Sequence, residues 1–241
     1  LLDALQRYGV DTGLIRALDQ PCGHTVIQVT EAGENCILLY GGTNTCLTES
    51  FVDETLCRFA PGDVLLLQNE VNGIPYLIRQ AVRRGLRVAF NAAPMAPEVA
   101  DYPLELLSWL VINEGEGAAL AGTQAPADIL DRLAQRCPDT QLLLTLGAGG
   151  SVCRAGGETW SCGVFPVRPV DTTAAGDTFL GYYLGALLAG APIPEALRLS
   201  SAASALCIQR RGAADAIPLL EEVRAALAAG SLGEMGKGAS L

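Results

Sequence analysis

The sequence contains little histidine and no paired cysteine motif. His24 is its single histidine, and its eight cysteines are scattered without a C-x-x-C pair. Because structural zinc sites draw their ligands from closely spaced Cys and His residues, a zinc site has little support. The cysteines are expected to be reduced, half-buried small apolar residues. They are Cys22, Cys36, Cys46, Cys57, Cys137, Cys153, Cys162 and Cys207.

A surplus of positive charge is also missing. The formal net charge is −10 at pH 7, and the sequence pI is near 4.6. A protein this acidic would release few counterions from a polyphosphate backbone, which argues against binding to nucleic acid or to an anionic membrane. The expected partner is therefore a small molecule.

Long apolar runs are absent as well. None reaches the roughly 18 to 20 residues that span a bilayer, and the first residues lack the basic, apolar, small-residue order of a signal peptide. A cytoplasmic protein is therefore predicted. The chain has no initiator methionine and opens on an amphipathic helical pattern at residues 1–5. We accordingly expect it to begin inside a longer protein.

What is present indicates one α/β domain. The 241 residues are 50% hydrophobic and 17% charged, which suits a single large core. Near-continuous apolar runs alternate with helical patterns such as 74–84 and 127–136. This order is typical of a parallel sheet covered on both faces. The apolar runs are residues 64–67, 87–90, 109–112 and 142–146.

Two segments predict β-hairpins instead. The first joins residues 24–30 and 36–40 through a turn-rich spacer, 31–35, and the second joins 151–154 and 159–164 across two glycines. Three helices then complete the chain, with starts expected near Ala175, Pro194 and Pro218. The glycine-rich end, 230–241, is predicted to be a frayed tail.

The sharpest chemical feature is a polar turn of small residues, 170–177, which leads directly into an apolar helical stretch, 179–188. Small side chains let backbone N–H groups approach an anion, and a helix N-terminus adds partial positive charge. The turn therefore suits a phosphate. Asp177 falls in the first helical turn, where a carboxylate either complements the helix dipole or acts as a general base. The residues alone leave both interpretations open.

The run Asp171-Thr172-Thr173-Ala174-Ala175-Gly176-Asp177-Thr178-Phe179 resembles the signature of the ribokinase (PfkB) family of sugar and nucleoside kinases. The resemblance implies an anion hole at Ala174, Ala175 and Gly176, with Asp177 contacting the sugar and activating its hydroxyl. It also implies the ribokinase-like fold, a three-layer α/β/α sandwich with a mostly parallel sheet and a small β lid. By this resemblance residues 1–241 form a single domain that lacks its N-terminal part, and 24–45 are the remaining lid strands.

Two further segments resemble the nucleotide-binding parts of that family. Asn113-Glu114-Gly115-Glu116 is similar to its N-x-x-E motif, which implies that Glu116 helps to hold Mg²⁺ through water; the alternative is an ordinary acidic helix start. Thr145-Leu146-Gly147-Ala148-Gly149-Gly150 resembles its nucleotide-binding strand and glycine turn. The nucleotide contacts implied are Asn113, Thr145, Gly147, Gly150 and Ser200, the last standing where the family generally places histidine or asparagine beside adenine.

The family resemblance extends to the sugar and to an activating potassium ion. Leu65-Leu66-Leu67-Gln68-Asn69-Glu70 resembles the strand whose glutamate contacts the sugar, which implies that role for Glu70, although a solvated strand-end glutamate is an equal alternative. The stretch 207–212 resembles one whose main-chain oxygens hold potassium. The implied potassium ligands are Asp171, Thr173, Cys207, Arg210 and Gly212.

Together these features predict an ATP-dependent sugar kinase with Mg²⁺ and K⁺ as cofactors. Its expected reaction is phosphorylation of a pentose hydroxymethyl group, with D-ribose converted to ribose 5-phosphate. The alternatives are another PfkB-type kinase, acting on fructose, a nucleoside or ketodeoxygluconate, and a non-catalytic nucleotide-binding fragment. The family resemblance also implies a homodimer for the full-length protein.

Overall fold

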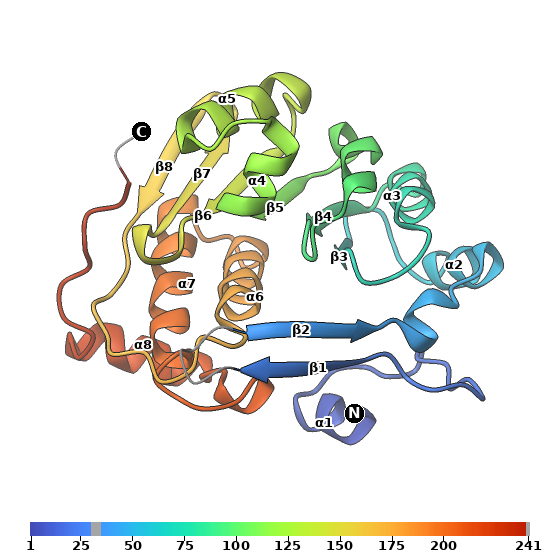
Figure 1. Cartoon of the computed structure of the whole chain (residues 1–241), viewed down its shortest axis with the longest axis horizontal. Coiled ribbons are helices and arrows are strands. Elements are labelled where there is room, and N and C mark those ends of the chain that lie inside the picture. Colours follow the sequence, from blue (N-terminus) through green and yellow to red (C-terminus); the bar gives the residue numbers. More distant parts are fainter. Residues whose placement is uncertain (30–34, 240–241) are drawn as a thin grey trace.

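A computed structural model describes residues 1–29 and 35–239 of the chain (Figure 1). Its main sheet has six strands in the order β3-β4-β5-β6-β7-β8, and a separate two-stranded sheet pairs β1 with β2. The strands are β1 (His24–Val29), β2 (Asn35–Tyr40), β3 (Val64–Gln68), β4 (Arg87–Asn91), β5 (Trp109–Asn113), β6 (Gln141–Thr145), β7 (Ser151–Ala155) and β8 (Glu158–Cys162).

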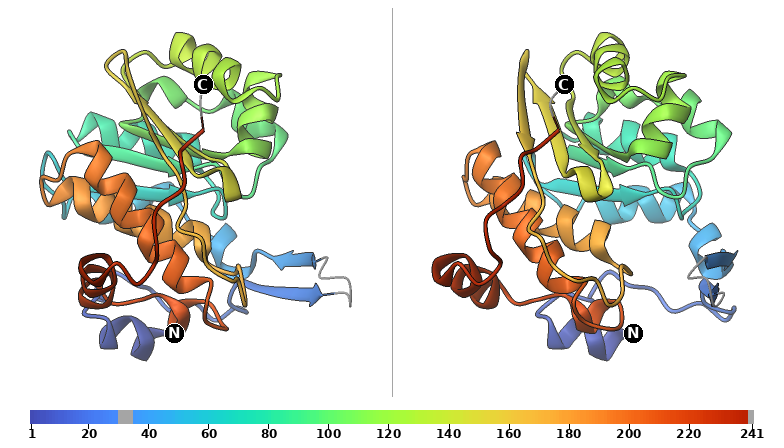
Figure 2. Two further views of the ribbon diagram at one scale, coloured as in Figure 1. Left: turned by 90° about the vertical axis from the view of Figure 1, so that its left-hand side faces the viewer. Right: turned by 60° about the vertical axis from the view of Figure 1, so that its left-hand side comes forward.

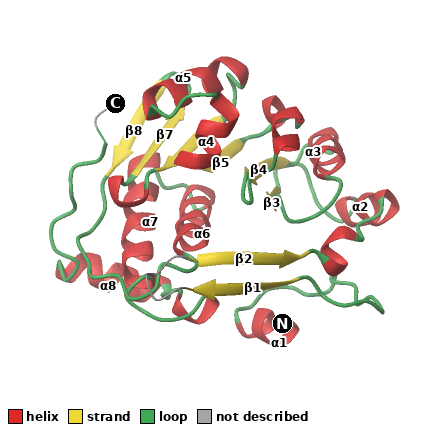
Figure 3. Ribbon diagram, viewed as in Figure 1, coloured by secondary structure: helices red, strands yellow, loops and turns green. Residues whose placement is uncertain are grey.

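Helices alternate with these strands along the chain (Figure 3). The α-helices are α1 (Leu2–Arg7), α2 (Glu49–Leu56), α3 (Ile74–Arg83), α4 (Glu114–Ala121), α5 (Pro126–Arg136), α6 (Ala175–Leu188), α7 (Ile193–Cys207) and α8 (Leu220–Ala229). Short 3₁₀ turns lie at η1 (Gly42–Thr45), η2 (Pro97–Asp101), η3 (Leu104–Leu106), η4 (Gly147–Gly149) and η5 (Ala214–Ala216). In the part of the chain described here, no helix combines the length and the apolar character that crossing a membrane requires.

The predicted parallel sheet is confirmed for β3 to β6, which pair in parallel, while β7 and β8 continue the sheet antiparallel. Successive side chains of a strand point to opposite faces, so each strand feeds two cores. On β4, Phe90 packs with residues of α2, α3 and α5, whereas Ala89 packs with residues of α6 and α7. The result is a three-layer α/β/α sandwich, as predicted.

The β1–β2 hairpin stands apart from the sandwich and projects from its side (Figure 2). Its strands pair antiparallel, from His24 with Tyr40 to Val29 with Asn35. The predicted pairing of the two segments is therefore confirmed, although residues 30–34, to which most of the predicted turn-rich spacer belongs, lie outside the described residues. Val26, Leu38, Leu39 and Tyr40 are exposed on this ribbon.

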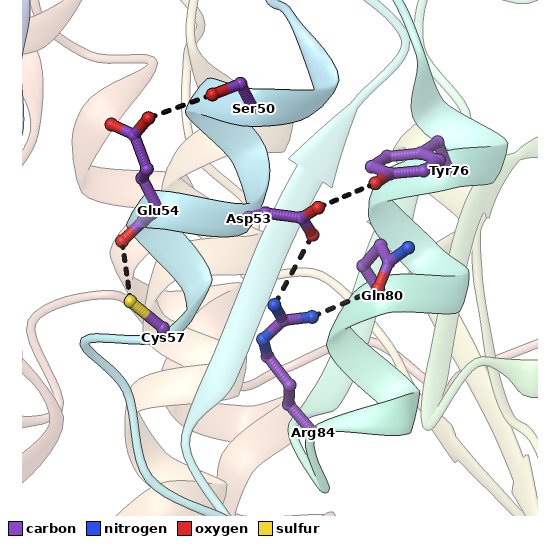
Figure 4. A network of polar contacts seen from close by, with 7 residues as sticks. All are labelled: Ser50, Asp53, Glu54, Cys57, Tyr76, Gln80 and Arg84. Atoms are coloured by element: carbon purple, nitrogen blue, oxygen red, sulfur yellow. Dashed lines mark hydrogen bonds and ion pairs between the residues drawn. The ribbon is translucent and has the colours of Figure 1, made fainter.

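Helices α2 and α3 are joined by polar contacts on the outer side of the sandwich (Figure 4). Asp53 of α2 accepts a hydrogen bond from the Tyr76 hydroxyl at 2.9 Å and pairs with Arg84 at 3.4 Å. Arg84 also donates to the Gln80 side chain at 3.0 Å. Beneath them, Val52, Leu77 and neighbouring apolar residues supply the buried contacts.

The glycine-rich end does not behave as the predicted frayed tail in its described part. Leu232 is buried with α7 and α8 residues, and the Gly236 N–H donates to the Val164 carbonyl at 2.9 Å. A side chain on Gly163 would meet the Gly236 carbonyl oxygen at 2.0 Å, so the two backbones are in close contact. The prediction was wrong because glycine content was taken for freedom where it permits close packing. Residues 240–241 are outside the described part.

Candidate active site

The polar turn before α6 leaves main-chain N–H donors free at the helix start. Its last residue, Ala174, has φ +59°, and the first intrahelical bond runs from the Thr178 N–H to the Ala174 carbonyl at 2.9 Å. The N–H groups of Gly176 and Asp177 precede that bond, at the end of the helix where backbone donors face outward. Apart from its chain neighbours and the backbone of its own helix, no described atom lies within 4 Å of the position that a Gly176 side chain would occupy. The turn thus presents main-chain donors without an obstructing side chain.

A cavity of about 340 Å³ gathers the predicted catalytic and substrate residues in front of this turn. Glu70 reaches it from the end of β3, Asn113 and Glu116 from the start of α4, and Asp177 from the first turn of α6. The carboxyl ends of parallel strands meet at one edge of a sheet, which is why residues so far apart in sequence converge there. The anion-hole residues Ala174, Ala175 and Gly176 complete the wall.

Gln68 is a site residue that sequence reasoning missed. It ends β3, and its Nε2 donates a hydrogen bond to Asp177 Oδ1 at 2.9 Å. Both residues line the 340 Å³ cavity and also a neighbouring one of about 420 Å³, which Asn44 and Val71 help to form. A polar residue closing an apolar strand at the carboxyl edge of the sheet was the available signal.

Asn113 and Glu116 form a complete capping box at the start of α4. Glu116 accepts from the Asn113 N–H and from the Asn113 side-chain amide, each at 2.8 Å, and the Glu116 N–H donates to Asn113 Oδ1 at 2.9 Å. Burial raises the pKa of the Glu116 carboxyl, and the two hydrogen bonds from Asn113 oppose that rise. The acidic helix start considered from the sequence is therefore present, at the wall of the cavity.

A second, mostly apolar cavity of about 460 Å³ adjoins the first. The two share Thr145, Thr172, Ala175, Gly176 and Phe179. Three of the predicted nucleotide residues, Thr145, Gly147 and Gly150, line this second cavity, and Asn113 lines the first. Gly150 has φ +94°, and a side chain there would lie 2.1 Å from the Cys162 carbonyl oxygen, so glycine is required.

Ser200 does not reach either cavity. It is fully buried, and its hydroxyl donates to the Ala196 carbonyl one turn back at 2.7 Å. Ser201 and Ser204 line the apolar cavity in its place and donate to the Gly163 and Ala175 carbonyls at 2.8 and 2.9 Å. Each residue of a helix is turned by about 100° from the one before it, so neighbouring serines point in different directions.

Four of the residues predicted to hold potassium are in contact where two segments join, while the side chain of the fifth, Arg210, pairs with Glu222 at 2.7 Å. Asp171 accepts from the Thr173 N–H at 2.9 Å and from the Gly212 N–H at 3.1 Å. The Thr173 side chain, then these two N–H groups and the nearby Arg211 charge, lower the pKa of Asp171 to about 2. Cys207 is buried, and its thiol lies 3.9 Å from the Thr173 carbonyl oxygen. Main-chain carbonyls and one ionised carboxylate are a donor set suited to a hard monovalent cation.

The described part of the site offers few direct protein ligands for a divalent cation. Within the described ranges, no group of three or more His, Cys, Asp and Glu side chains is arranged to hold a metal. Glu116 is the buried carboxylate on the cavity wall, and both of its oxygens already accept hydrogen bonds from Asn113. This arrangement fits a cation that keeps most of its waters, as Mg²⁺ does.

A helix start with unobstructed main-chain donors, a carboxylate in its first turn and an adjoining apolar cavity are features of α/β phosphotransferases. The chain belongs to the pfkB family of carbohydrate kinases, whose model matches residues 1–220.

Similarity to individual relatives extends over most of the chain. The ribokinase of Haemophilus influenzae is 34% identical over 227 residues, which are 91% of this chain and 74% of that protein. The crystal structure of ribokinase from Thermotoga maritima has 31% identity and a TM-score of 0.78, and the match covers 94% of this chain and 76% of that one. The structure of Arabidopsis thaliana ribokinase complexed with ribose and ATP has 28% identity and a TM-score of 0.72, with 87% and 70% covered.

Proposed function

We propose that this carbohydrate kinase transfers the γ-phosphoryl group of ATP to the 5-hydroxymethyl group of D-ribose, with Asp177 as the general base. One observation carries the proposal. A single cavity places Asp177, the 174–176 turn and Glu70 together, and it adjoins an apolar cavity lined by the glycine turn of β6. The ribose- and ATP-bound relative and the ribokinase from Haemophilus influenzae support ribose and ATP as the substrates.

Each wall of the cavity has a part in the reaction. Asp177 takes the proton of the attacking hydroxyl, while the N–H groups at the start of α6 stabilise the negative charge on the transferring phosphoryl group. Glu70, exposed at the end of β3, binds the sugar hydroxyls on the same side. Phosphoryl transfer depends mainly on positioning, so bringing these groups to one cavity is the main catalytic contribution of the fold.

The nucleotide occupies the apolar cavity. Phe165, Val167 and Ile208 present apolar surface to the base, and Gly147 and Gly150 let the backbone approach the phosphates. The shared residues Thr145 and Gly176 lie where the phosphate chain passes into the first cavity. ATP is thereby directed with its γ-phosphate towards Asp177.

Two cations complete the proposed site. Glu116, supported by Asn113, would hold Mg²⁺ through water, and the ion would neutralise charge on the phosphates. Asp171 and the main-chain oxygens of Thr173, Cys207, Arg210 and Gly212 would hold K⁺ beside the anion-binding turn. The hydrogen bonds from Thr173 and Gly212 to Asp171 already join those two loops.

We further propose that residues 1–241 form one domain in which 24–45 act as the lid, and that two copies associate through this lid in the full-length protein. The exposed Val26, Leu38, Leu39 and Tyr40 favour a covered ribbon. A cytoplasmic location is supported by the free state of the cysteines that the structure describes, since thiols persist in reducing compartments.

Replacing Asp177 by Asn tests the base. Turnover of ATP with D-ribose, Mg²⁺ and K⁺ should fall by about 10² to 10⁴, the usual cost of removing a positioned base. The matched control is Asp128→Asn, because Asp128 occupies the same third position of helix α5 and does not line either cavity. It should retain the parent rate.

Fructose and nucleosides serve as competing acceptors in the same assay, and phosphorus NMR of the product identifies the phosphorylated oxygen. If Asp177→Asn and the parent protein turn over ATP at the same rate, Asp177 is not the general base. If the parent protein phosphorylates fructose or a nucleoside faster than ribose, that acceptor is the substrate and ribose is not. If it phosphorylates none of these acceptors, the proposed kinase reaction is refuted.

A further inference from the structure

We infer that Gln68 is a positioning residue for the base: it anchors Asp177 Oδ1 and leaves Oδ2 to receive the proton of the sugar. The inference rests on the proposed role of Asp177. Its geometric basis is the 2.9 Å bond from Gln68 Nε2 to Asp177 Oδ1, which joins the end of β3 to the first turn of α6 across 109 positions of sequence.

The same helix position behaves differently elsewhere in this chain. Glu116 and Glu222 are the third residues of α4 and α8, and each turns back to accept the N–H of its own N-cap residue, at 2.8 and 2.7 Å. These two glutamates close their helix starts in the manner of a capping box, whereas Asp128, the third residue of α5, does not, since the Ala125 N–H donates to the Thr123 hydroxyl instead. Asp177, the third residue of α6, instead accepts from another element of the fold.

This difference has a chemical consequence. A carboxylate turned back onto its own helix is a cap, whereas one held by a neighbouring strand remains at the cavity wall. Gln68 and Asp177 line both the 340 Å³ and the 420 Å³ cavities, so the pair lies at their boundary. One oxygen of Asp177 is held by the amide, and the carboxylate is thereby oriented at the cavity wall.

The amide orientation at Gln68 is determined by its partner. An ionised carboxylate can only accept hydrogen bonds, so the NH₂ end of the amide must face Asp177. Gln68 is partly buried at the end of β3, and its backbone is in register with Asn91 of β4, which restricts where its side chain can reach.

Two substitutions test this role. Gln68→Leu removes the donor at similar volume, and we expect kcat with ribose and ATP to fall about tenfold, with the KM for ATP unchanged. The acid limb of the pH–rate profile should move to higher pH, because the carboxylate has lost a hydrogen-bond donor. Gln68→Glu places a second carboxylate there, and the limb should move further in the same direction.

The control is Gln80→Leu, the same substitution at an amide on α3 that accepts from Arg84 and lines neither cavity (Figure 4). It should keep the parent kcat and pH profile. Thermal unfolding of each variant separates a loss of fold from a loss of positioning, since a purely structural role would lower Tm and leave the acid limb in place.

The possible failures can be told apart. If Asp177→Asn loses turnover while Gln68→Leu keeps the parent rate and acid limb, this inference is wrong and the proposed function stands. If Asp177→Asn remains active, or the parent has no kinase turnover, the proposed function fails and this inference fails with it. An ordered rise of the acid limb from parent to Gln68→Leu to Gln68→Glu supports the positioning role.

Discussion

Ala174 carries the backbone strain of the site. Among the residues that the structure describes, Ala174 is the one non-glycine residue with a positive φ, at +59°. It is also the N-cap residue of α6. An L-residue with a side chain costs roughly 1 kcal/mol or more in this left-handed region. The strain lies in the turn that leads into α6, whose residues 174–177 line the 340 Å³ cavity.

Replacing Ala174 by Gly should raise the free energy of unfolding by about 1 kcal/mol, because glycine adopts positive φ without strain. Ala174→Val should lower it by at least as much, since a β-branched residue is poorly accommodated there. Urea denaturation measures both. The control is Ala119→Gly, in the interior of α4, which should lower the free energy of unfolding by about 1 kcal/mol. If Ala174→Gly lowers the free energy of unfolding, the backbone of Ala174 is not strained.

At the level of elements, α8 is held by its apolar face rather than by its ion pair. Val223 is fully buried among residues of α7 and the 165–167 segment, whereas Arg210 and Glu222 form a partly exposed pair at 2.7 Å. Exposed pairs contribute little to stability. Val223→Ala should therefore lower the free energy of unfolding by about 2 kcal/mol, and Glu222→Gln by much less.

The effect of Glu222→Gln should depend on pH in a defined direction. The Arg210 guanidinium and then the Leu219 N–H lower the pKa of Glu222 in the folded state. A depressed pKa stabilises the fold above the unfolded value, about 4.5, and the contribution is lost as pH falls through the folded value. The parent and variant unfolding midpoints should therefore differ at pH 7 and converge in acid. A difference that persists below the folded pKa would contradict the ionic contribution.

At the level of the whole molecule, the buried thiols can report on the stability of the sandwich. Cys22 and Cys57 are exposed, while Cys137, Cys153, Cys162 and Cys207 are buried. Burial raises the pKa of Cys153 to about 11, so little reactive thiolate forms there at neutral pH.

A thiol reagent at pH 8 should label Cys22 and Cys57 in the native protein, and the four buried cysteines should be labelled only on unfolding. Peptide mass spectrometry follows each cysteine separately, and labelling across a urea series should follow the unfolding curve measured by circular dichroism. Rapid native labelling of Cys153 would contradict the burial that the structure shows.

The order of strands and helices follows from the local sequence. Apolar periodicity is set by neighbouring residues, and it predicted β3 to β6, the second hairpin and the starts of α6 and α7 to within one or two residues. The run from Asp171 to Phe179 likewise predicted a turn that leads directly into α6, because a turn of small residues entering a helix is a local property.

Contacts between distant segments did not follow in the same way. The pairing of Gln68 with Asp177, the choice of Ser201 over Ser200 at the apolar cavity, and the docking of Gly236 beside Val164 all come from packing. A strand end and a helix start separated by 109 positions meet only once the sheet is assembled, and a one-residue step on a helix turns a side chain by about 100°. Sequence patterns determine which elements form, and the assembled layers determine which side chains share a cavity.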